Sequence, residues 1–222
     1  MGQKIKPECF VDFLLFARDE YTTKHCQTVA VISQKLAADL KFSNNIIEHI
    51  VTAAYLHDIG KITWDDTLLK GSNQASSQEW LKIKNHPEIA GRFLYQMLSP
   101  VLKEHERLWI ALVWVHHWKY VRDDDDYPPP SVIHGTIHPV LSACHLKFED
   151  ETWDLVRGVI QVADCFHAAV AERPYHHQKR TTQEALNDLF TKQEEKNRKL
   201  FHPKVLQCLG DNCRWLEEII GR

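Results

Sequence analysis

Side chains that commonly bind transition metals recur between residues 25 and 164 of this chain, mostly within apolar segments. Five histidines and two aspartates make up the series, in the order His25, His57, Asp58, His86, His116, His117 and Asp164. Neutral imidazole and carboxylate together suit Zn, Fe, Mn or Ni. A buried carboxylate without a partner is costly, so such groups must fold against one another or against a cation. The pattern therefore predicts an all-helical metal protein rather than a simple apolar bundle.

The rest of the chain is patterned for helices, with apolar residues three or four positions apart and no β-rich segment. We expect helices over residues 8–20, 25–40, 45–58, 87–97, 104–118, 152–171, 181–200 and 203–220. These form one all-α helical bundle over residues 1–222, with an N-terminal helix inside residues 1–21. Because Pro128, Pro129 and Pro130 interrupt the helical pattern, residues 123–151 are expected to form a loop-rich insertion.

Local signals predict where several helices begin and end. Capping boxes are expected at Asn45 with Glu48 and at Thr181 with Glu184. Pro87 suits the first turn of a helix, which would make His86 its cap. Gly60 can adopt the left-handed conformation that ends a helix after His57 and Asp58.

Charge and cysteine content exclude several classes of protein. The chain has 27 Lys and Arg against 30 Asp and Glu, so no basic excess indicates a nucleic-acid partner. Its six cysteines form no C-x-x-C pair, which disfavours a structural zinc site and favours reduced thiols in a cytoplasmic protein. The apolar run from Phe10 to Phe16 is short and contains Asp12, so it predicts neither a signal peptide nor a membrane span. The sequence does not define an oligomeric state.

The number and spacing of the candidate ligands favour two ions over one. Adjacent residues on a helix point about 100° apart, so His116 and His117 suit two different ions, or one ion and a bound phosphate. Asp58 has two oxygens and can bridge ions about 3.5–4 Å apart, an arrangement that clamps a phosphoryl group. Each histidine alone is more typical of a helix cap, and Asp164 alone could form a buried salt bridge. The ordered set predicts a two-metal hydrolase.

In the order of these ligands, the chain resembles the HD superfamily of metal-dependent phosphohydrolases over residues 22–207. It is most similar to the HD-GYP branch, which hydrolyses cyclic di-GMP. His25, His57-Asp58 and Asp164 match the H…HD…D ligands of the superfamily. The blocks that match the branch are Leu56-His57-Asp58-Ile59-Gly60-Lys61-Ile62 (LHDIGKI), Leu69-Lys70, His86-Pro87-Glu88-Ile89, His116-His117, Val162-Ala163-Asp164-Cys165-Phe166-His167-Ala168 (VADVFDA in the branch), Glu172-Arg173-Pro174-Tyr175 (DRPY) and Phe201-His202-Pro203 (FDP).

The resemblance implies a single HD-domain fold and a role for each matching residue. The first ion would be held by His25, His57, Asp58 and Asp164, and the second by Asp58, His86, His116 and His117. Asp58 and Lys61 would be the catalytic residues, with a hydroxide between the ions as nucleophile. Lys61 would also bind the scissile phosphate, and Arg173 would reach another phosphate of the substrate. Residue type alone leaves simpler interpretations open, a helix-terminal charge for Lys61 and a solvated loop residue for Arg173.

The chain departs from the branch mainly after the histidine pair. Trp118 follows the pair where the branch has Glu, and Asp126-Tyr127-Pro128 stands in place of Gly-Tyr-Pro. The acidic run from Asp123 to Asp126 is expected to be a solvated loop. Some members hold a third metal through an acid four residues before the first histidine; that position is Tyr21 here, so two ions are expected.

The insertion itself carries His134, His138 and His145. Histidines on an insertion usually lie at the surface, which is the expectation here; a lid over the active site is the alternative.

These features predict a phosphodiesterase that cleaves a cyclic dinucleotide, with cyclic di-GMP as the first choice and cyclic GMP-AMP as an open alternative. A broader HD phosphohydrolase, either a nucleotide phosphatase or a single-strand nuclease, would share the ligand order. A nuclease should also show a basic groove. A signalling module that binds a nucleotide or a protein without turnover is a third possibility, against which the intact ligands and Lys61 argue. We expect no sensory domain before the helical domain, so the chain would either work alone or take its signal from a separate protein. No membrane partner is expected.

Overall fold

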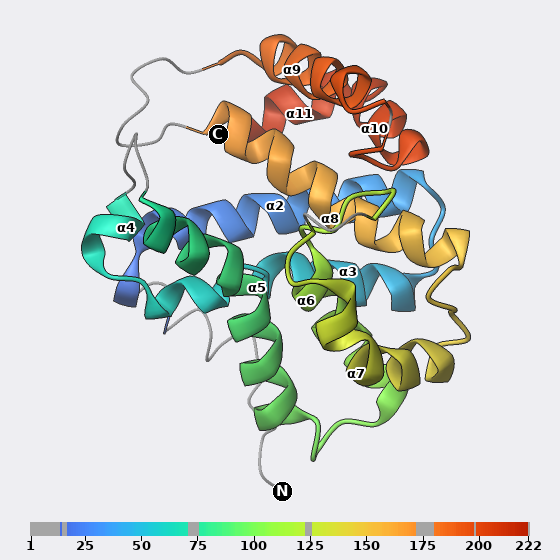
Figure 1. Ribbon diagram of the computed structural model, residues 1–222. Coiled ribbons are helices and arrows are strands. Elements are labelled where there is room, and N and C mark those ends of the chain that lie inside the picture. The colour runs from blue at the N-terminus through green and yellow to red at the C-terminus, as the bar shows by residue number, and fades with distance from the viewer. Residues whose placement is uncertain are drawn as a thin grey trace, which may run out of the picture.

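The computed structural model describes residues 14, 17–70, 76–122, 126–171, 180–197 and 199–221, and the regular secondary structure in these ranges is entirely helical (Figure 1). The α-helices are α2 (Glu20–Asp39), α3 (Asn44–Leu56), α4 (Asp66–Lys70), α5 (Ser77–Leu98), α6 (Leu108–Val115), α7 (Pro130–Ala143), α8 (Glu151–Val170), α9 (Thr182–Glu195), α10 (Pro203–Gly210) and α11 (Cys213–Ile220). Two short 3-10 helices, η1 (Ile59–Thr63) and η2 (Glu104–Arg107), precede α4 and α6. The predicted all-α fold is confirmed.

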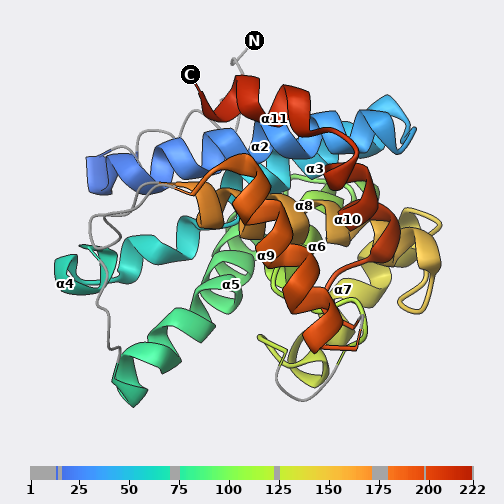
Figure 2. The same ribbon diagram turned by 90° about the horizontal axis from the view of Figure 1, so that it is seen from above.

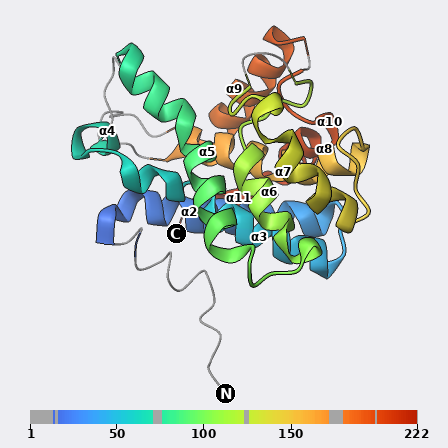
Figure 3. The same cartoon turned by 60° about the horizontal axis from the view of Figure 1, so that its bottom comes forward.

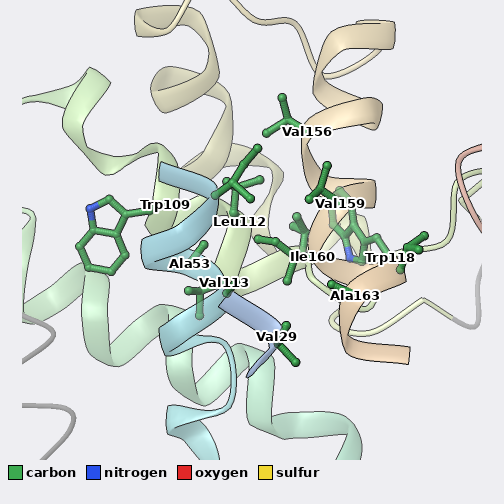
Figure 4. Close-up of a cluster of buried hydrophobic side chains, with 14 of the residues drawn as sticks. Val29, Ala53, Trp109, Leu112, Val113, Trp118, Val156, Val159, Ile160 and Ala163 are labelled. Carbon is green, nitrogen blue, oxygen red and sulfur yellow. The ribbon is translucent and has the colours of Figure 1, made fainter. Parts of the chain in front are cut away.

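Helix α6 is the centre of the core. All eight of its residues are buried, as expected for a helix that is apolar on every side. Helices α3, α5, α7 and α8 pack around it. Figure 4 shows Leu112 and Val113 of α6 among Ala53 of α3 and Val159 and Ile160 of α8.

Helix α2 packs along both α3 and α8, and α5 packs beside α6 (Figure 3). Helices α9, α10 and α11 cover the outer side of α8 and α2, with α11 lying along α2 (Figure 2). This packing brings the middle of α2, the end of α3 and the second half of α8 together in the interior. None of the described helices is both long and apolar enough to cross a membrane.

Side-chain caps explain where several helices begin. Asp19 accepts a hydrogen bond from Thr22 N at 2.9 Å at the start of α2. The predicted box of Thr181 and Glu184 opens α9 and is confirmed. The box predicted at Asn45 is wrong, because α3 begins one residue earlier with Ser43 as its N-cap and no side-chain hydrogen bond.

Other helix bounds also differ from expectation. The helix predicted over residues 8–20 lies almost entirely outside the described residues, and α2 begins at Glu20. The helix predicted over residues 181–200 ends at Glu195, and the one over 203–220 is divided into α10 and α11. Its first part ends at Gly210, where a Cβ would lie 3.0 Å from the ring of Phe190.

The insertion is not the loop that the prolines predicted, because it contains the 14-residue helix α7. Pro130 occupies the first position of this helix, where the missing N–H costs nothing. Ile133, Ile137 and Val140 recur at helical spacing and are buried against the core, which offsets the cost of Pro139 inside the helix. His134 and His138 are exposed on the opposite face, in agreement with the surface position expected for them.

Candidate metal centre

The fold brings all seven predicted ligands together from five helical elements. Helix α2 supplies His25 and α8 supplies Asp164, whereas His86 comes from the middle of α5. The other four follow helix ends: His57-Asp58 directly after α3 and His116-His117 directly after α6. All seven side chains are buried or nearly so. They form two groups that share Asp58.

The first group consists of His25, His57, Asp58 and Asp164. His25 Nε2 lies 3.0 Å from Asp164 Oδ1, and His57 Nε2 lies 3.4 Å from Asp58 Oδ2. The remaining imidazole–carboxylate separations, from His25 to Asp58 and from His57 to Asp164, are both 3.7 Å. Ligands about 2.1 Å from one ion are separated by roughly 3.0–3.4 Å. A small closing movement would let these four atoms share an ion.

The second group consists of Asp58, His86, His116 and His117. His86 Nε2 lies 3.2 Å from Asp58 Oδ1 and 3.2 Å from His116 Nε2. Ligand atoms of the three histidines all lie within 4.8 Å of one another. Asp58 therefore directs Oδ2 to the first group and Oδ1 to the second, which is the arrangement of a bridging carboxylate.

The backbone fixes which ring nitrogen is available in three of these histidines. Nδ1 of His57, His86 and His116 contacts the carbonyl oxygen three residues earlier, at 2.7, 2.6 and 2.6 Å. A carbonyl can only accept, so each Nδ1 carries its hydrogen, and each ring presents a lone pair at Nε2 once it is neutral. The end of α3 leaves the carbonyl of Ala54 available to His57, and the end of α6 leaves that of Val113 available to His116.

This tautomer makes the donor set suitable for metal ions. Two Nε2 lone pairs, those of His86 and His116, face each other at 3.2 Å and repel unless a cation or a proton lies between them. Nε2 of His57 is fully buried and has no hydrogen-bond partner in the described part of the chain. Orphaned buried nitrogens of this kind are normally satisfied by a ligand. The residues present therefore fit divalent ions.

Pro87 has a different role from the predicted one. The capping box of Ser76 and Glu79 opens α5, so the helix does not begin at Pro87, which lies ten residues inside it. Proline has no N–H, so it cannot donate to the carbonyl of Ile83 four residues earlier. That carbonyl accepts from His86 Nδ1 instead. Pro87 thus frees the oxygen that orients the neighbouring metal ligand.

Replacing Pro87 by Ala should weaken the second metal site while favouring the helix. An alanine N–H would compete for the Ile83 carbonyl, and losing such an orienting partner typically lowers metal affinity about 10–100-fold. Metal titration of Pro87→Ala against a competing chelator measures this, and its metal-free thermal midpoint should not fall, because proline is unfavourable inside a helix.

Pro139→Ala is the matched control, since Pro139 also lies inside a helix but in α7. It should leave metal affinity unchanged. Equal affinity in Pro87→Ala and the wild type would refute this role for Pro87.

Gly60 is required for close packing and not for a left-handed turn, so the predicted helix stop is wrong. It lies in the 3-10 helix η1, and a Cβ at this position would be 2.1 Å from the carbonyl oxygen of His86. Only glycine lets η1 approach α5 this closely. The approach brings Asp58 against His86, with Asp58 Oδ1 3.2 Å from His86 Nε2.

Burial and charge set the protonation of the centre. Burial lowers the pKa of His117 to about 3, and burial followed by the neighbouring histidines lowers the pKa of His116 well below its usual value. Although burial alone would raise it, Lys61 and His57 hold the pKa of Asp58 well below its usual range. Contact with His25, together with the charge of His57, similarly outweighs burial and keeps the pKa of Asp164 low. Neutral imidazoles and ionised carboxylates are the forms that bind metal.

The lowered histidine pKa values predict acid sensitivity of the metal-free protein. Burial lowers the pKa of five histidines below the ordinary value of 6.5, a set made up of His25, His49, His116, His117 and His202. Below about pH 6.5 the unfolded chain binds protons that these buried rings do not, so stability falls as the pH falls. Asp58 raises the pKa of His57 against the effect of burial, so protonation of His57 stabilises the folded state at low pH. This single histidine opposes the five whose pKa values are lowered.

The thermal midpoint of chelator-treated protein should therefore drop by several degrees between pH 7 and pH 5.5. His117→Gln, which cannot be protonated in this range, should show a smaller drop. A midpoint that rises on acidification would contradict the burial of neutral histidines.

The loop after His117 is held by the residues that depart from the HD-GYP pattern. Trp118 is completely buried and donates from Nε1 to the carbonyl of Pro128 at 2.7 Å. Asp126 accepts from Lys119 N at 3.1 Å and is 3% exposed, so the expectation of a solvated acidic residue is wrong at this position. Residues 123–125 lie outside the described ranges. In this loop the centre of the Tyr127 ring lies 4.7 Å from the centre of the His117 ring.

Lys61 lies at the edge of the centre. Its ammonium contacts Asp58 Oδ2 and sits 5.5 Å from the centre of the Trp64 ring. Asp58 raises the pKa of Lys61 despite burial, so the group stays cationic. Arg173, the other predicted phosphate-binding residue, lies outside the described residues.

Sequence reasoning missed three side chains of the centre. His167 contacts His25, Cys26 Sγ lies within 4.8 Å of ligand atoms of His57 and Asp58, and the Trp64 ring packs edge-on to His86. Spacing could have revealed His167, because it follows Asp164 by three positions on one helix face. No comparable signal marks Cys26 or Trp64.

Comparisons with known proteins identify the family of this chain. The profile of the HD domain family matches residues 22–169. The chain is similar to the cyclic di-GMP phosphodiesterase of Thermotoga maritima, with 28% identity over 190 residues that cover 86% of this chain and 44% of that protein. It is also similar to the 3′3′-cGAMP-specific phosphodiesterase 3 of Vibrio cholerae, with 29% identity over 171 residues that cover 76% of this chain and 32% of that protein. The chain thus spans less than half the length of these relatives.

A solved structure has a similar fold. The HD domain of the phosphodiesterase PgpH from L. monocytogenes, in complex with cyclic-di-AMP, aligns with a TM-score of 0.62. The alignment covers 98% of this chain and 100% of that domain at 12% sequence identity. The likeness at this identity concerns the fold alone.

Proposed function

This chain belongs to the HD domain family, and we propose that it is a two-metal phosphodiesterase that hydrolyses a cyclic dinucleotide. The observation that carries the proposal is the position of Asp58, whose two oxygens face separate groups of imidazole nitrogens at 3.2 and 3.4 Å. The first ion would be held by His25, His57, Asp58 and Asp164, and the second by Asp58, His86, His116 and His117.

Bound as a pair, divalent ions would stabilise charge on the phosphoryl oxygens and lower the pKa of an attacking water. The protein contributes the geometry. The carbonyls behind His57, His86 and His116 hold their rings in the metal-binding tautomer. Such orienting bonds reduce the reorganisation that binding would otherwise require.

Lys61 is the cation placed to receive the scissile phosphate. It is partly exposed, whereas its partner Asp58 is 1% exposed, so its ammonium can contact a substrate without leaving the edge of the centre. A fixed positive charge beside a phosphoryl group stabilises the charge that develops during attack. Arg173 remains a predicted contact to a second phosphate.

Tyr127 contributes a neutral hydrogen-bond donor at the same edge. Burial and then the charge of Asp164 raise the pKa of its hydroxyl well above the usual value, so the group keeps its proton at neutral pH. Its ring lies against His117. A phenol in this position can donate to a phosphate or a sugar oxygen of a bound nucleotide.

The relatives indicate the substrate class. The names of the curated relatives describe cyclic di-GMP and 3′3′-cGAMP phosphodiesterases, and both substrates are cyclic dinucleotides. We propose cyclic di-GMP as the first substrate to test and 3′3′-cGAMP as the second. A separate signalling protein as partner remains an expectation.

Turnover assays on metal-loaded protein test this proposal. The protein is loaded with Mn, Fe, Ni or Zn and offered cyclic di-GMP, 3′3′-cGAMP, bis(p-nitrophenyl) phosphate and single-stranded DNA. We expect a linear dinucleotide or mononucleotide product from a cyclic dinucleotide. Cleavage of DNA with no attack on either cyclic dinucleotide would replace the substrate class by that of a nuclease. Tight nucleotide binding without turnover by the loaded protein would contradict the enzymatic proposal.

A further inference from the structure

His25 differs from the other metal-binding histidines in how its second ring nitrogen is satisfied. His57, His86 and His116 use backbone carbonyls that a helix end or a proline leaves available. His25 lies within the uninterrupted helix α2, where the carbonyl three residues earlier accepts its usual helical bond. It therefore needs a partner from another element.

That partner is His167 of α8. Nδ1 of His25 lies 2.7 Å from Nδ1 of His167, and the two ring centres are 4.9 Å apart. Asp164, one helical turn earlier on α8, contacts Nε2 on the other side of the His25 ring at 3.0 Å. Helix α8 thus contacts both nitrogens of this imidazole.

The direction of the bond between the two rings determines whether His25 can bind metal. Between two neutral imidazoles one Nδ1 must donate and the other accept. If His25 accepts, its hydrogen is on Nε2, which then cannot be a ligand. If His25 donates, the Nε2 lone pair faces Asp58 and Asp164, as the first metal site requires.

We propose that His167 is a positioning residue for the first metal ion, accepting at Nδ1 the hydrogen bond that holds His25 in its metal-binding tautomer. This inference rests on the proposed two-metal function. The HD-GYP pattern that this segment resembles has Asp at the same place, so the position would keep a hydrogen-bond acceptor while its side chain differs. His167 lies behind His25, on the side of the ring away from Asp164, and so acts through His25.

Two isosteric substitutions isolate the acceptor. The Oδ1 atom of Asn can occupy the place of the His Nδ1, so His167→Asn keeps the hydrogen bond. His167→Leu has the same branching and no acceptor. Zinc titration against a competing chelator should show first-site affinity about 10–100-fold weaker in His167→Leu and close to wild type in His167→Asn.

A spectroscopic measurement separates positioning from a general loss of structure. Long-range proton–nitrogen spectra of the zinc-loaded protein should show His25 protonated at Nδ1 in the wild type and in His167→Asn. In His167→Leu this signal should weaken or shift, while the signals of His57, His86 and His116 stay in place. The metal-free thermal midpoints of the two variants should agree.

The outcomes distinguish this inference from the proposed function. Two ions per chain and equal first-site affinity in His167→Leu and His167→Asn would overturn the inference alone. One ion per chain, bound more weakly in His167→Leu, would support the inference and overturn the two-metal function. A wild-type protein that binds no zinc would overturn both.

Discussion

Asp58→Asn should remove both metal ions together and reduce phosphodiesterase activity at least about 10³-fold, since paired ions supply several kcal/mol of transition-state stabilisation. The substitution keeps the shape of the side chain and removes the negative charge that both groups share. Asp58 is 1% exposed and contacts His57 of the first group, His86 of the second and Lys61, so its carboxylate is shared between the groups. Elemental analysis of the loaded variant, with turnover measured on the same sample, checks the prediction.

Asp65→Asn is the matched control for Asp58→Asn. Asp65 is seven residues away, exposed, and paired with Lys82 at 3.0 Å. The Asp65→Asn variant should retain two ions and full activity. A variant at Asp58 that keeps one ion would show that the two groups bind independently.

Lys61→Met should retain both ions and lower kcat about 10²–10³-fold, the loss typical of removing one group that stabilises developing charge. Methionine keeps most of the aliphatic stem and removes the ammonium that lies 5.5 Å from the centre of the Trp64 ring. Asp58 stays ionised in this variant, because His57 also lowers the pKa of its carboxyl group. The effect should therefore appear in kcat while metal content is unchanged.

Lys82→Met, at an exposed lysine whose partner is Asp65, is the control and should not alter kcat. If Lys61 were only a helix-terminal charge, Lys61→Met would change the thermal midpoint slightly and leave kcat as it was.

The ligand set was predictable from sequence because it depends on residue type and order. Helical spacing predicted α8 and the position of Asp164 within it, and it predicted a helix over residues 104–118, where α6 precedes His116. The fold then had only to bring these segments together. Their convergence agrees with the prediction, although the metal roles themselves stay predictions.

Several errors of the sequence analysis come from prolines and glycines. Pro87 was interpreted as a helix start, but a proline inside a helix is tolerated when a side chain uses the freed carbonyl, as His86 does. Pro130 was interpreted as a break, although it begins α7. Gly60 is needed because of an approach by α5, which is far from it in sequence. Tertiary contacts of this kind leave no local pattern.

Contacts across helices were also beyond local reasoning. The pairing of His167 with His25 spans 142 positions of sequence, and the bond from Trp118 to Pro128 depends on how the loop folds back. Asp126 is polar and lies in an acidic run, and its sequence gives no sign of the hydrogen bond that it accepts from Lys119 N in the buried state. Departures from the family pattern at these positions therefore became interpretable only in the structure.

Anomalous diffraction from a crystal of the manganese- or zinc-loaded protein tests the central claim most directly. The shared position of Asp58 predicts two peaks about 3.5–4 Å apart, one on each side of its carboxylate. One peak should lie among His25, His57 and Asp164, and the other among His86, His116 and His117. A single peak, or two peaks that do not share Asp58, would contradict the two-metal centre.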